Sequence, residues 1–329
     1  MIFFLQLIER WLIKRGIKMK KALVLGASGA MGYAITKELC GRGIDVIAFA
    51  RNKEKLEKLF YDEERIQIIA GNVFKQADIM EAAKDVDVIF HAVNIPYTDW
   101  EIKQPELLKN ILETTKHHGA KLAMVDNIYA YGRQGRGKVT EEVVKNPHTK
   151  KGKIRLQLEL MAKQAGVPVL TAHFPDFYGP NAESTLVHHT LQGVLANKIS
   201  SFVGDKKLAR EYIFTPDGAK AIVELALRDS AYGQNWNIPG VGVITGEEMI
   251  GHIRELTGYK KPIMTVKKRM IGMLGLFDKQ MKEFLEMLYL TEEPVVLSGE
   301  KYESYIGEVP KTSYHEGLKE TILFLKGRN

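Results

Sequence analysis

The chain has 329 residues, 45% of them hydrophobic and 26% charged, a globular composition long enough for one large domain or a core with a smaller lobe. Its single cysteine, Cys40, excludes an internal disulfide framework, so we expect a structural thiol in a cytoplasmic protein. Most of the net charge of +7 lies in residues 1–21, where six bases and one acid give 6 − 1 = +5. A nucleic-acid binder would carry its basic surface on the folded body, so we expect no nucleic-acid partner.

Residues 1–18 form an apolar and basic segment that precedes the first element we predict. Glu9 and Arg10 interrupt its apolar runs, which are therefore too short to span a bilayer, and no small-residue cleavage site follows as in a secretory signal. We expect no stable membrane insertion, with a helix lying on a membrane surface as the alternative. Because the segment from Met19 opens a first strand on its own, we interpret residues 1–18 as an extension whose removal leaves folding unchanged.

Short β-branched runs alternate with segments of helical periodicity over most of the length of the chain. We predict strands at Lys20–Leu25, Ile44–Phe49, Ile66–Ala70, Asp87–Ala92, Lys121–Val125 and Val167–Phe174. Helices fit between them at about Met31–Gly41, Gln76–Lys84, Pro105–His118 and Lys153–Ala165. This order predicts an α/β fold with a doubly wound (Rossmann) parallel sheet and helices on both faces.

Beyond about residue 180 the alternation loosens, which predicts a smaller C-terminal lobe. Thr215-Pro216-Asp217 has the form of an N-cap followed by a first-turn proline and predicts a helix to Arg228. Thr245 and Glu248 have the spacing of a capping box and predict another helix. A third helix, over Val266–Leu290, carries a methionine-rich stripe that we expect to pack on the body of the protein rather than on a membrane or cofactor.

A glycine-rich segment joins the first predicted strand to the first predicted helix, and it reads Gly26-Ala27-Ser28-Gly29-Ala30-Met31-Gly32. Glycines at this place let the chain turn sharply and let a pyrophosphate approach bare backbone. The start of the helix then offers unpaired N–H groups and a partial positive charge to the anion. We expect these seven residues to hold the phosphates of a dinucleotide.

The Gly-x-x-Gly-x-x-Gly spacing resembles that of the extended and atypical short-chain dehydrogenase/reductase superfamily, which includes nucleotide-sugar epimerases and dehydratases. Five further matches to this family follow in order, namely Gly71-Asn72-Val73, His91-Ala92-Val93, Asn110, Phe174–Pro180 and Arg210–Asp217. The resemblance covers about residues 20–260. It implies a Rossmann domain at residues 19–180 and a mainly substrate-binding lobe at residues 181–329, with some segments returning to the core.

The resemblance also implies an NAD(P)-dependent oxidoreductase, epimerase or dehydratase that acts on a hydroxyl or carbonyl, with nucleotide sugars as one substrate class. Beyond the glycine-rich loop, the implied cofactor contacts are Arg51, Asn72, Val73, Ala92, Val93, Asn94, Lys151, Phe174, Pro175 and Phe177. The implied substrate contacts are Tyr178 and Arg210, the latter at a position that binds a substrate phosphate in nucleotide-sugar enzymes.

The end of the second predicted strand indicates which dinucleotide binds. An NAD site usually places an acidic residue there to accept hydrogen bonds from the ribose hydroxyls. This chain instead has Arg51, whose guanidinium can bind a 2′-phosphate that a carboxylate would repel. We therefore predict NADP rather than NAD as cofactor, with the alternative that Arg51 stacks on the adenine and discriminates little.

All three standard catalytic residues of the family are substituted. Asn127 occupies the Ser/Thr position, Lys151 the Tyr position and Arg155 the Lys position. Lys151 is one candidate for proton transfer, because a cation one helical turn away and a nicotinamide cation would lower its pKa. Tyr129 is another, if the extended geometry of the strand persists beyond Asn127.

Two functions therefore stay open: an enzyme with a substituted catalytic set, and a non-catalytic NADP(H)-binding redox sensor or interaction protein. We expect a small-molecule substrate, and a homodimer is possible. The pairs His117–His118 and His188–His189 are neighbours whose side chains point apart on helices, so we predict surface positions and no metal site.

Overall fold

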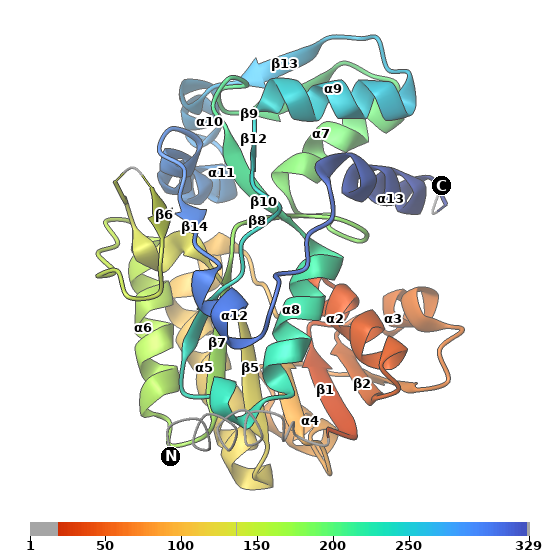
Figure 1. Ribbon diagram of the computed structural model, residues 1–329, viewed down its shortest axis with the longest axis vertical. Coiled ribbons are helices and arrows are strands. Elements are labelled where there is room, and N and C mark those ends of the chain that lie inside the picture. The colour runs from red at the N-terminus through yellow and green to blue at the C-terminus, as the bar shows by residue number, and fades with distance from the viewer. Residues whose placement is uncertain (1–18, 136, 328–329) are drawn as a thin grey trace, which may run out of the picture.

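The computed structural model describes residues 19–135 and 137–327, so the predicted extension at residues 1–18 lies outside the described part. A seven-stranded parallel sheet with the order β11-β7-β5-β4-β1-β2-β3 forms its centre (Figure 1). The strands are β1 (Lys21–Leu25), β2 (Asp45–Ala50), β3 (Ile66–Ala70), β4 (Val88–His91), β5 (Lys121–Asn127), β7 (Val169–Phe174) and β11 (Asn235–Asn237). The predicted α/β doubly wound sheet is confirmed.

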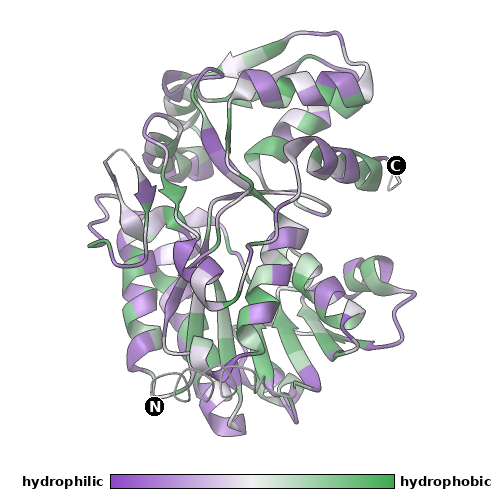
Figure 2. Cartoon of the chain, in the orientation of Figure 1, coloured by the Kyte–Doolittle hydropathy of each residue, from purple (hydrophilic) through white to green (hydrophobic). Residues whose placement is uncertain are grey.

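Helices cover both faces of this sheet because its strands are apolar on both sides. In β1, Ala22 and Val24 face one core and Leu23 and Leu25 face the other. The first core includes residues of α2 (Ala30–Gly41), α3 (Lys53–Phe60) and α8 (Thr215–Ala226). The second includes residues of α4 (Gln76–Ala82), α5 (Trp100–His118) and α6 (Lys150–Gln164). Figure 2 shows the hydrophobic residues concentrated on these strands.

The six predicted strands lie within two residues of their observed bounds, but some elements differ. Helix α3 was not predicted; it begins where the Asn52 side chain accepts the Lys55 N–H at 2.9 Å. Nor was β11, a three-residue strand that the lobe contributes to the sheet beside β7. The helix predicted from Pro105 begins five residues earlier, at Trp100, so that proline lies inside the helix.

The C-terminal lobe has its own core between two small sheets and three helices. One sheet has the order β12-β10-β8, and the other pairs β13 with β9. The strands are β8 (Asp176–Tyr178), β9 (Ser200–Val203), β10 (Arg210–Phe214), β12 (Val243–Ile244) and β13 (Ile263–Val266). The helices are α7 (Leu186–Leu195), α9 (Gly246–Thr257) and α13 (Tyr314–Lys326). The predicted capping box at Thr245 and Glu248 is confirmed, whereas the N-cap of α8 is Phe214 rather than Thr215.

A smaller unit joins the lobe to the sheet. It consists of the strands β6 (Lys138–Val139) and β14 (Val296–Leu297), which pair in parallel, and the short helix α12 (Glu300–Tyr305). No helix in the described ranges is long and apolar enough to cross a membrane.

The single helix predicted over Val266–Leu290 is wrong. The segment forms α10 (Lys268–Leu274), α11 (Lys279–Leu285) and the 3₁₀ segment η4 (Glu286–Thr291). Two local features break it: Gly275 lets the end of α10 approach the Lys282 backbone, and the Asp278 side chain caps α11 by accepting two backbone N–H groups. The expected packing of the methionine stripe on the body is therefore also wrong in part, since Met273 and Phe277 are exposed.

Candidate active site

The glycine-rich loop crosses from β1 to α2, and two of its glycines are required by the protein itself. Gly26 has φ +85°, and a Cβ there would lie 2.7 Å from the carbonyl oxygen of Ala92. At Gly32 a Cβ would lie 2.1 Å from the carbonyl oxygen of Gly26. These two glycines therefore allow the end of β4 and the first turn of α2 to pack against the loop.

Gly29 is a glycine that neither packing nor backbone conformation requires. Its φ of −93° suits any residue, and a Cβ there would meet only the Gly26 carbonyl oxygen, at 3.4 Å. It lies exposed at the N-cap of α2, and the first turn of that helix carries no acidic residue and no side-chain cap. The open space beside Gly29 and the uncapped N–H groups of this turn fit the pyrophosphate of a dinucleotide.

The other loop residues contribute backbone rather than side chains. Ala27 and Met31 are buried in the core, and the N–H groups of Gly26 and Ala27 both donate to the carbonyl oxygen of Phe49. An anion at this loop would therefore meet the N–H groups of the first helical turn, which belong to Ala30, Met31 and Gly32. Ser28 lies between these two parts of the loop and is half-buried.

Predicted cofactor residues gather around the loop at the carboxyl ends of the neighbouring strands. The Ala92 N–H donates to the Leu25 carbonyl oxygen at 3.0 Å, and Val93 and the exposed Asn94 follow directly after β4. Burial, assisted by the positive charge of Arg155, lowers the pKa of the adjacent His91 to about 3, so that imidazole is neutral.

Two further groups of predicted cofactor residues lie at strand ends: Arg51 follows β2, and Asn72 and Val73 follow β3. Arg51 is exposed after β2 and forms no hydrogen bond or ion pair with another described residue. Asn72 has a structural role as well, because its side chain accepts the Phe74 N–H at 3.1 Å. Val73 is buried. The guanidinium of Arg51 is thus available to a ligand at the carboxyl ends of the strands, where the glycine-rich loop also lies.

At the end of β5 the chain turns out of the extended conformation. The Asn127 side chain accepts the Tyr129 N–H at 3.0 Å and caps the 3₁₀ segment η2 (Ile128–Tyr131). The expectation that Tyr129 shares a strand face with Asn127 is therefore wrong, because the strand ends at Asn127. The Tyr129 phenol instead lies 2.8 Å from the phenol of Tyr97, in the 3₁₀ segment η1 (Tyr97–Asp99).

The two phenols form a pair whose protons are firmly held. Burial raises the pKa of Tyr129 well above its usual value and raises the pKa of Tyr97 to about 12. Tyr97, Tyr129 and Asn127 are nevertheless only partly buried as residues. Tyr97 is a residue that sequence reasoning missed, although it follows shortly after the recognised His91-Ala92-Val93 segment.

Lys151 is only 1% exposed and is engaged in ion pairs. Its ammonium pairs with the carboxylates of Glu283 and Glu286, the latter at 2.9 Å. It also lies 5.6 Å from the centroid of the Tyr97 ring. Two carboxylates that the sequence did not reveal thus lie beside the Lys151 ammonium. No sequence motif marks Glu283 or Glu286.

Arg155 lies one helical turn further along α6 and is also buried. Its Nε lies 3.3 Å from Asp126 Oδ1, and the guanidinium lies 4.3 Å from the centroid of the Trp100 ring. Arg155 Nε and Asp126 Oδ2 have no hydrogen-bond partner among the described residues. The contact with Asp126 thus places Arg155 at the end of β5, next to Asn127.

The predicted contacts that follow β7 divide into accessible and buried positions. Phe177 is half-buried, whereas Phe174 and Pro175 are buried. Tyr178 packs between the rings of Phe214 and Tyr314, with centroids 5.5 and 5.6 Å away.

Arg210 is buried as well: it donates to the Val203 carbonyl oxygen at 3.0 Å, and the rings of Phe202 and Tyr212 flank its guanidinium at 5.2 and 5.3 Å. The predicted substrate contacts Tyr178 and Arg210 therefore belong to the packing of the lobe.

One of the two histidine pairs differs from expectation, although His117 and His189 are exposed as predicted. The rings of His117 and His118 meet edge to face with centroids 4.9 Å apart, so the prediction that they point apart is wrong. His189 Nε2 lies 2.8 Å from Ser201 Oγ. Within residues 19–135 and 137–327 no group of three or more His, Cys, Asp or Glu side chains is arranged to hold a metal ion.

Comparisons of sequence agree with this geometry. Residues 26–158 match the profile of the family described as NAD(P)H-binding, which starts at the glycine-rich loop. Over 79 residues the chain is 32% identical to mouse (Mus musculus) sterol-4-alpha-carboxylate 3-dehydrogenase, decarboxylating, covering 24% of this chain and 20% of the relative. Over 112 residues it is 28% identical to the Bos taurus protein of the same name, covering 32% and 29%. The chain thus matches less than a third of the length of these curated relatives.

Solved structures resemble the whole chain. The dTDP-glucose 4,6-dehydratase of Bacillus anthracis, in complex with NAD, has a TM-score of 0.77 at 20% identity, covering 94% of this chain and 97% of that one. The UDP-glucuronic acid 4-epimerase of Bacillus cereus, also with NAD, has a TM-score of 0.75 at 18% identity, covering 94% and 99%. Residues 26–158 thus match the NAD(P)H-binding family, and the chain has the same fold as these two nucleotide-sugar enzymes.

Proposed function

We propose that the chain is an NADP-dependent oxidoreductase that reduces a carbonyl or oxidises a hydroxyl of a small molecule. The observation that carries the proposal is the open space at Gly29, a glycine that neither packing nor backbone conformation requires, at the uncapped start of α2. Residues of the first turn of α2 would hold the pyrophosphate, and Arg51 would bind the 2′-phosphate. When bound, the dinucleotide supplies or accepts the hydride.

The proton is assigned to Tyr129 because this residue is only partly buried, whereas Lys151 is almost completely buried. Of the four candidate catalytic residues, Asn127 and Tyr129 retain accessible surface, whereas Lys151 and Arg155 are buried in ion pairs. In reduction, the Tyr129 phenol donates its proton to the carbonyl oxygen of the substrate. The Tyr97 phenol, 2.8 Å away, hydrogen-bonds to it. The Asn127 side-chain amide, whose oxygen is held by the Tyr129 N–H, presents its NH₂ group to the same substrate oxygen.

The raised pKa values of the two phenols favour one direction of reaction. A group with a raised pKa keeps its proton across the neutral range and serves as an acid rather than a base. We therefore propose carbonyl reduction with NADPH as the main activity near neutral pH.

Substituting Tyr129 tests this assignment. Tyr129→Phe removes the proton but keeps the ring, so it should lower the turnover of NADPH with a carbonyl substrate at least about a hundredfold. The affinity for NADPH should change less than about threefold, because the phenol does not hold the phosphates. Tyr61→Phe, at an exposed position outside the site, is the matched control. An active Tyr129→Phe beside an inactive but folded Lys151→Met would assign the proton to Lys151 instead.

Cofactor selectivity is tested at Arg51. NADPH should bind at least about tenfold more tightly than NADH, a difference of ~1.4 kcal/mol that one charge-assisted contact supplies. Arg51→Asp should reverse the order, since a carboxylate repels the 2′-phosphate and accepts hydrogen bonds from the ribose. Lys58→Asp makes the same charge change at the other end of α3 and should leave the order unchanged. Calorimetric titration measures both affinities, and equal affinities in the unmutated protein would contradict the assignment.

The second candidate function is a redox sensor that binds NADP(H) without turnover. The observation that favours it is the burial of Lys151, the residue at the position of the family's catalytic tyrosine, beneath Glu283 and Glu286. Tight NADPH binding without turnover on sugar nucleotides, aldehydes and ketones would identify this function.

A further inference from the structure

The turn between α10 and α11 exposes a compact group of large apolar side chains, which we call the apolar tip. It consists of Met270, Met273, Leu274, Leu276 and Phe277. Phe277 is 93% exposed, Leu276 79% and Met273 69%. Scattered exposed apolar residues are normal on a protein surface, but a contiguous group within eight residues indicates an interaction site.

The tip is held in place by the local structure. The N–H groups of Phe277 and Asp278 both donate to the Leu274 carbonyl oxygen at 3.0 Å, and Asp278 caps α11. Inward of the tip, Ile271 is buried and packs with Val203 and Leu288. The fold therefore buries one side of α10 and presents Leu276 and Phe277 outward on a hydrogen-bonded turn.

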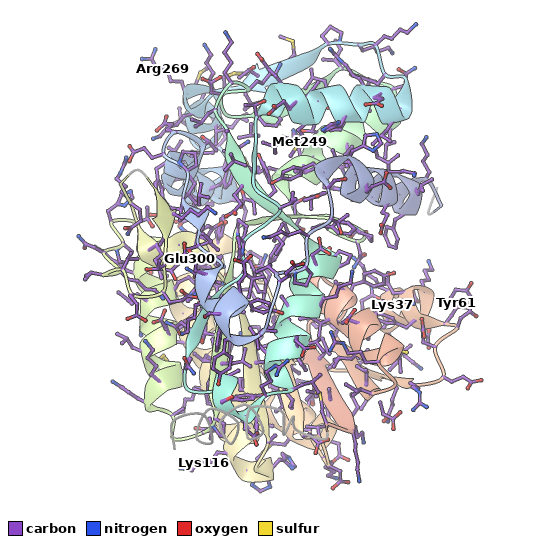
Figure 3. The ribbon with its side chains drawn as sticks, in the orientation of Figure 1. Lys37, Tyr61, Lys116, Met249, Arg269 and Glu300 are labelled. Atoms are coloured by element: carbon purple, nitrogen blue, oxygen red, sulfur yellow. The ribbon has the colours of Figure 1, made fainter. Side chains whose placement is uncertain are left out.

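Basic residues flank the tip on both sides. Lys267, Lys268 and Arg269 precede it, and Lys279 and Lys282 follow it; all five are exposed. Asp278 is the one acid between residues 267 and 282, so this segment carries 5 − 1 = +4. Figure 3 shows Arg269 at the upper margin of the molecule, directed away from the body.

Glu283 and Glu286 follow this segment, and both carboxylates pair with the buried Lys151, whose charge offsets one of the two. Glu292 contacts one of the five bases, Lys268, at 3.2 Å. The apolar tip is thus flanked along the chain by an excess of positive charge.

We propose that the apolar tip docks on an anionic lipid bilayer surface. Leu276 and Phe277 enter the boundary between headgroups and acyl chains, and the flanking bases contact the lipid phosphates, the arrangement of a protein that lies on a membrane without crossing it. A second copy of this chain fits less well, because a two-fold contact through the tip would bring two +4 segments together. Charge complementarity therefore favours the anionic membrane.

Docking would bring the candidate active site close to the membrane. On the side of α11 away from the tip, Phe284 stacks on Tyr97 with ring centroids 6.5 Å apart. Gln280 donates to the Thr98 hydroxyl at 3.1 Å. The helix that carries part of the positive surface thus also contacts Tyr97 of the proposed phenol pair. Docking itself does not depend on whether that site is catalytic.

Vesicle binding of the full-length protein tests the proposal. It should co-sediment with vesicles of phosphatidylcholine and phosphatidylglycerol and at least about tenfold more weakly with phosphatidylcholine alone. The double variant Leu276→Ser/Phe277→Ser should lose at least about tenfold in partitioning to the anionic vesicles. Tyr61→Ser changes a residue as exposed as Leu276, at 79%, and should bind like the unmutated protein; Figure 3 shows Tyr61 at the right margin, away from Arg269 at the upper left. Circular dichroism verifies that both variants are folded.

Residues 1–18 are also apolar and basic, so a variant lacking them is compared in the same assay. That variant should keep most of the vesicle binding. The proposal is overturned if the full-length protein does not bind anionic vesicles, if the double variant binds them equally well, or if only the loss of residues 1–18 abolishes binding. A dimer in analytical ultracentrifugation that the double variant dissociates, without vesicle binding, would instead assign the tip to a second copy.

Discussion

Replacing Glu159 with leucine should lower the free energy of unfolding by about 3–5 kcal/mol, because it leaves a buried ammonium without its partner. Glu159, on α6, is 3% exposed and pairs with Lys145, which is 7% exposed. It also accepts hydrogen bonds from Asn235 at 2.7 Å and Lys163 at 2.9 Å, and lies 3.5 Å from His173 Nε2. The network joins α6 to the β7–β11 edge of the sheet.

The change of the free energy of unfolding at acid pH should also report the contribution of Glu159. Burial alone would raise the pKa of Glu159, but His173 and Lys145 outweigh it and hold that pKa well below its usual range. A depressed folded-state pKa gives stability that is present above the unfolded-state pKa of about 4.3 and is lost as pH falls below it. The Glu159→Leu variant should lack this part of the acid dependence.

Chemical denaturation at pH 7 measures the loss. Glu303→Leu breaks the ion pair with Lys311, both of whose side chains are 42% exposed, and as the matched control it should cost less than about 1 kcal/mol. Adding Lys145→Met to Glu159→Leu should recover part of the stability, since it removes the unpaired charge. A cost for Glu159→Leu no greater than that of the control would show that this network does not stabilise the fold.

Alanine substitutions at two glycines of the loop should have different effects, one on the stability of the protein and the other on its affinity for NADPH. Gly32→Ala places a methyl group 2.1 Å from the Gly26 carbonyl oxygen and should destabilise the protein by about 3 kcal/mol, since backbone must move to accommodate it. Gly29→Ala meets no such atom and should cost less than about 1 kcal/mol of stability. It should still weaken NADPH binding at least about tenfold, because its methyl group lies where the pyrophosphate would approach.

Gly41→Ala, near the end of α2 with nothing within 4 Å, is the matched control for both measurements. It should leave NADPH affinity unchanged. If Gly29→Ala binds NADPH as tightly as the unmutated protein, the space beside Gly29 is not the phosphate site. If Gly32→Ala is as stable as Gly41→Ala, the close packing of α2 on the loop does not limit stability.

The sheet could be predicted because its signals are local and repeated. Continuous apolar runs such as that of β4 mark strands buried on both faces, and the glycine spacing marks the first strand–helix turn. Short elements were missed for the opposite reason. The three residues of β11 carry too little pattern, and their place beside β7 results from packing of distant segments.

The positions of candidate-site residues at the ends of strands could be predicted from the sequence. The positions that depend on contacts between distant parts of the chain could not. The loop and Arg51 lie at strand ends, which the sequence locates directly. The partners of Lys151 come from residues more than 130 positions away, so no local spacing reveals them. Tyr129 was assigned a strand geometry because nothing in the residue types shows that the Asn127 side chain caps a 3₁₀ turn there.

The methionine-rich segment shows how an unbroken helical period can mislead. Its apolar residues recur at helical spacing, yet Gly275 and Asp278 divide it into α10 and α11. The residues at the break therefore turn outward and form the apolar tip instead of packing on the body. A capping residue three positions after a glycine is the local signal that would have predicted the break.

The central claim is that the loop from Gly26 to Gly32 binds a nicotinamide dinucleotide phosphate, and calorimetric titration of the purified protein with NADPH tests it most directly. The account predicts saturable binding at about one site per chain, weakened at least about tenfold in Gly29→Ala and unchanged in Gly41→Ala. Folded protein that shows no saturable binding of NADPH or NADH, or that binds equally well in all three forms, would contradict it.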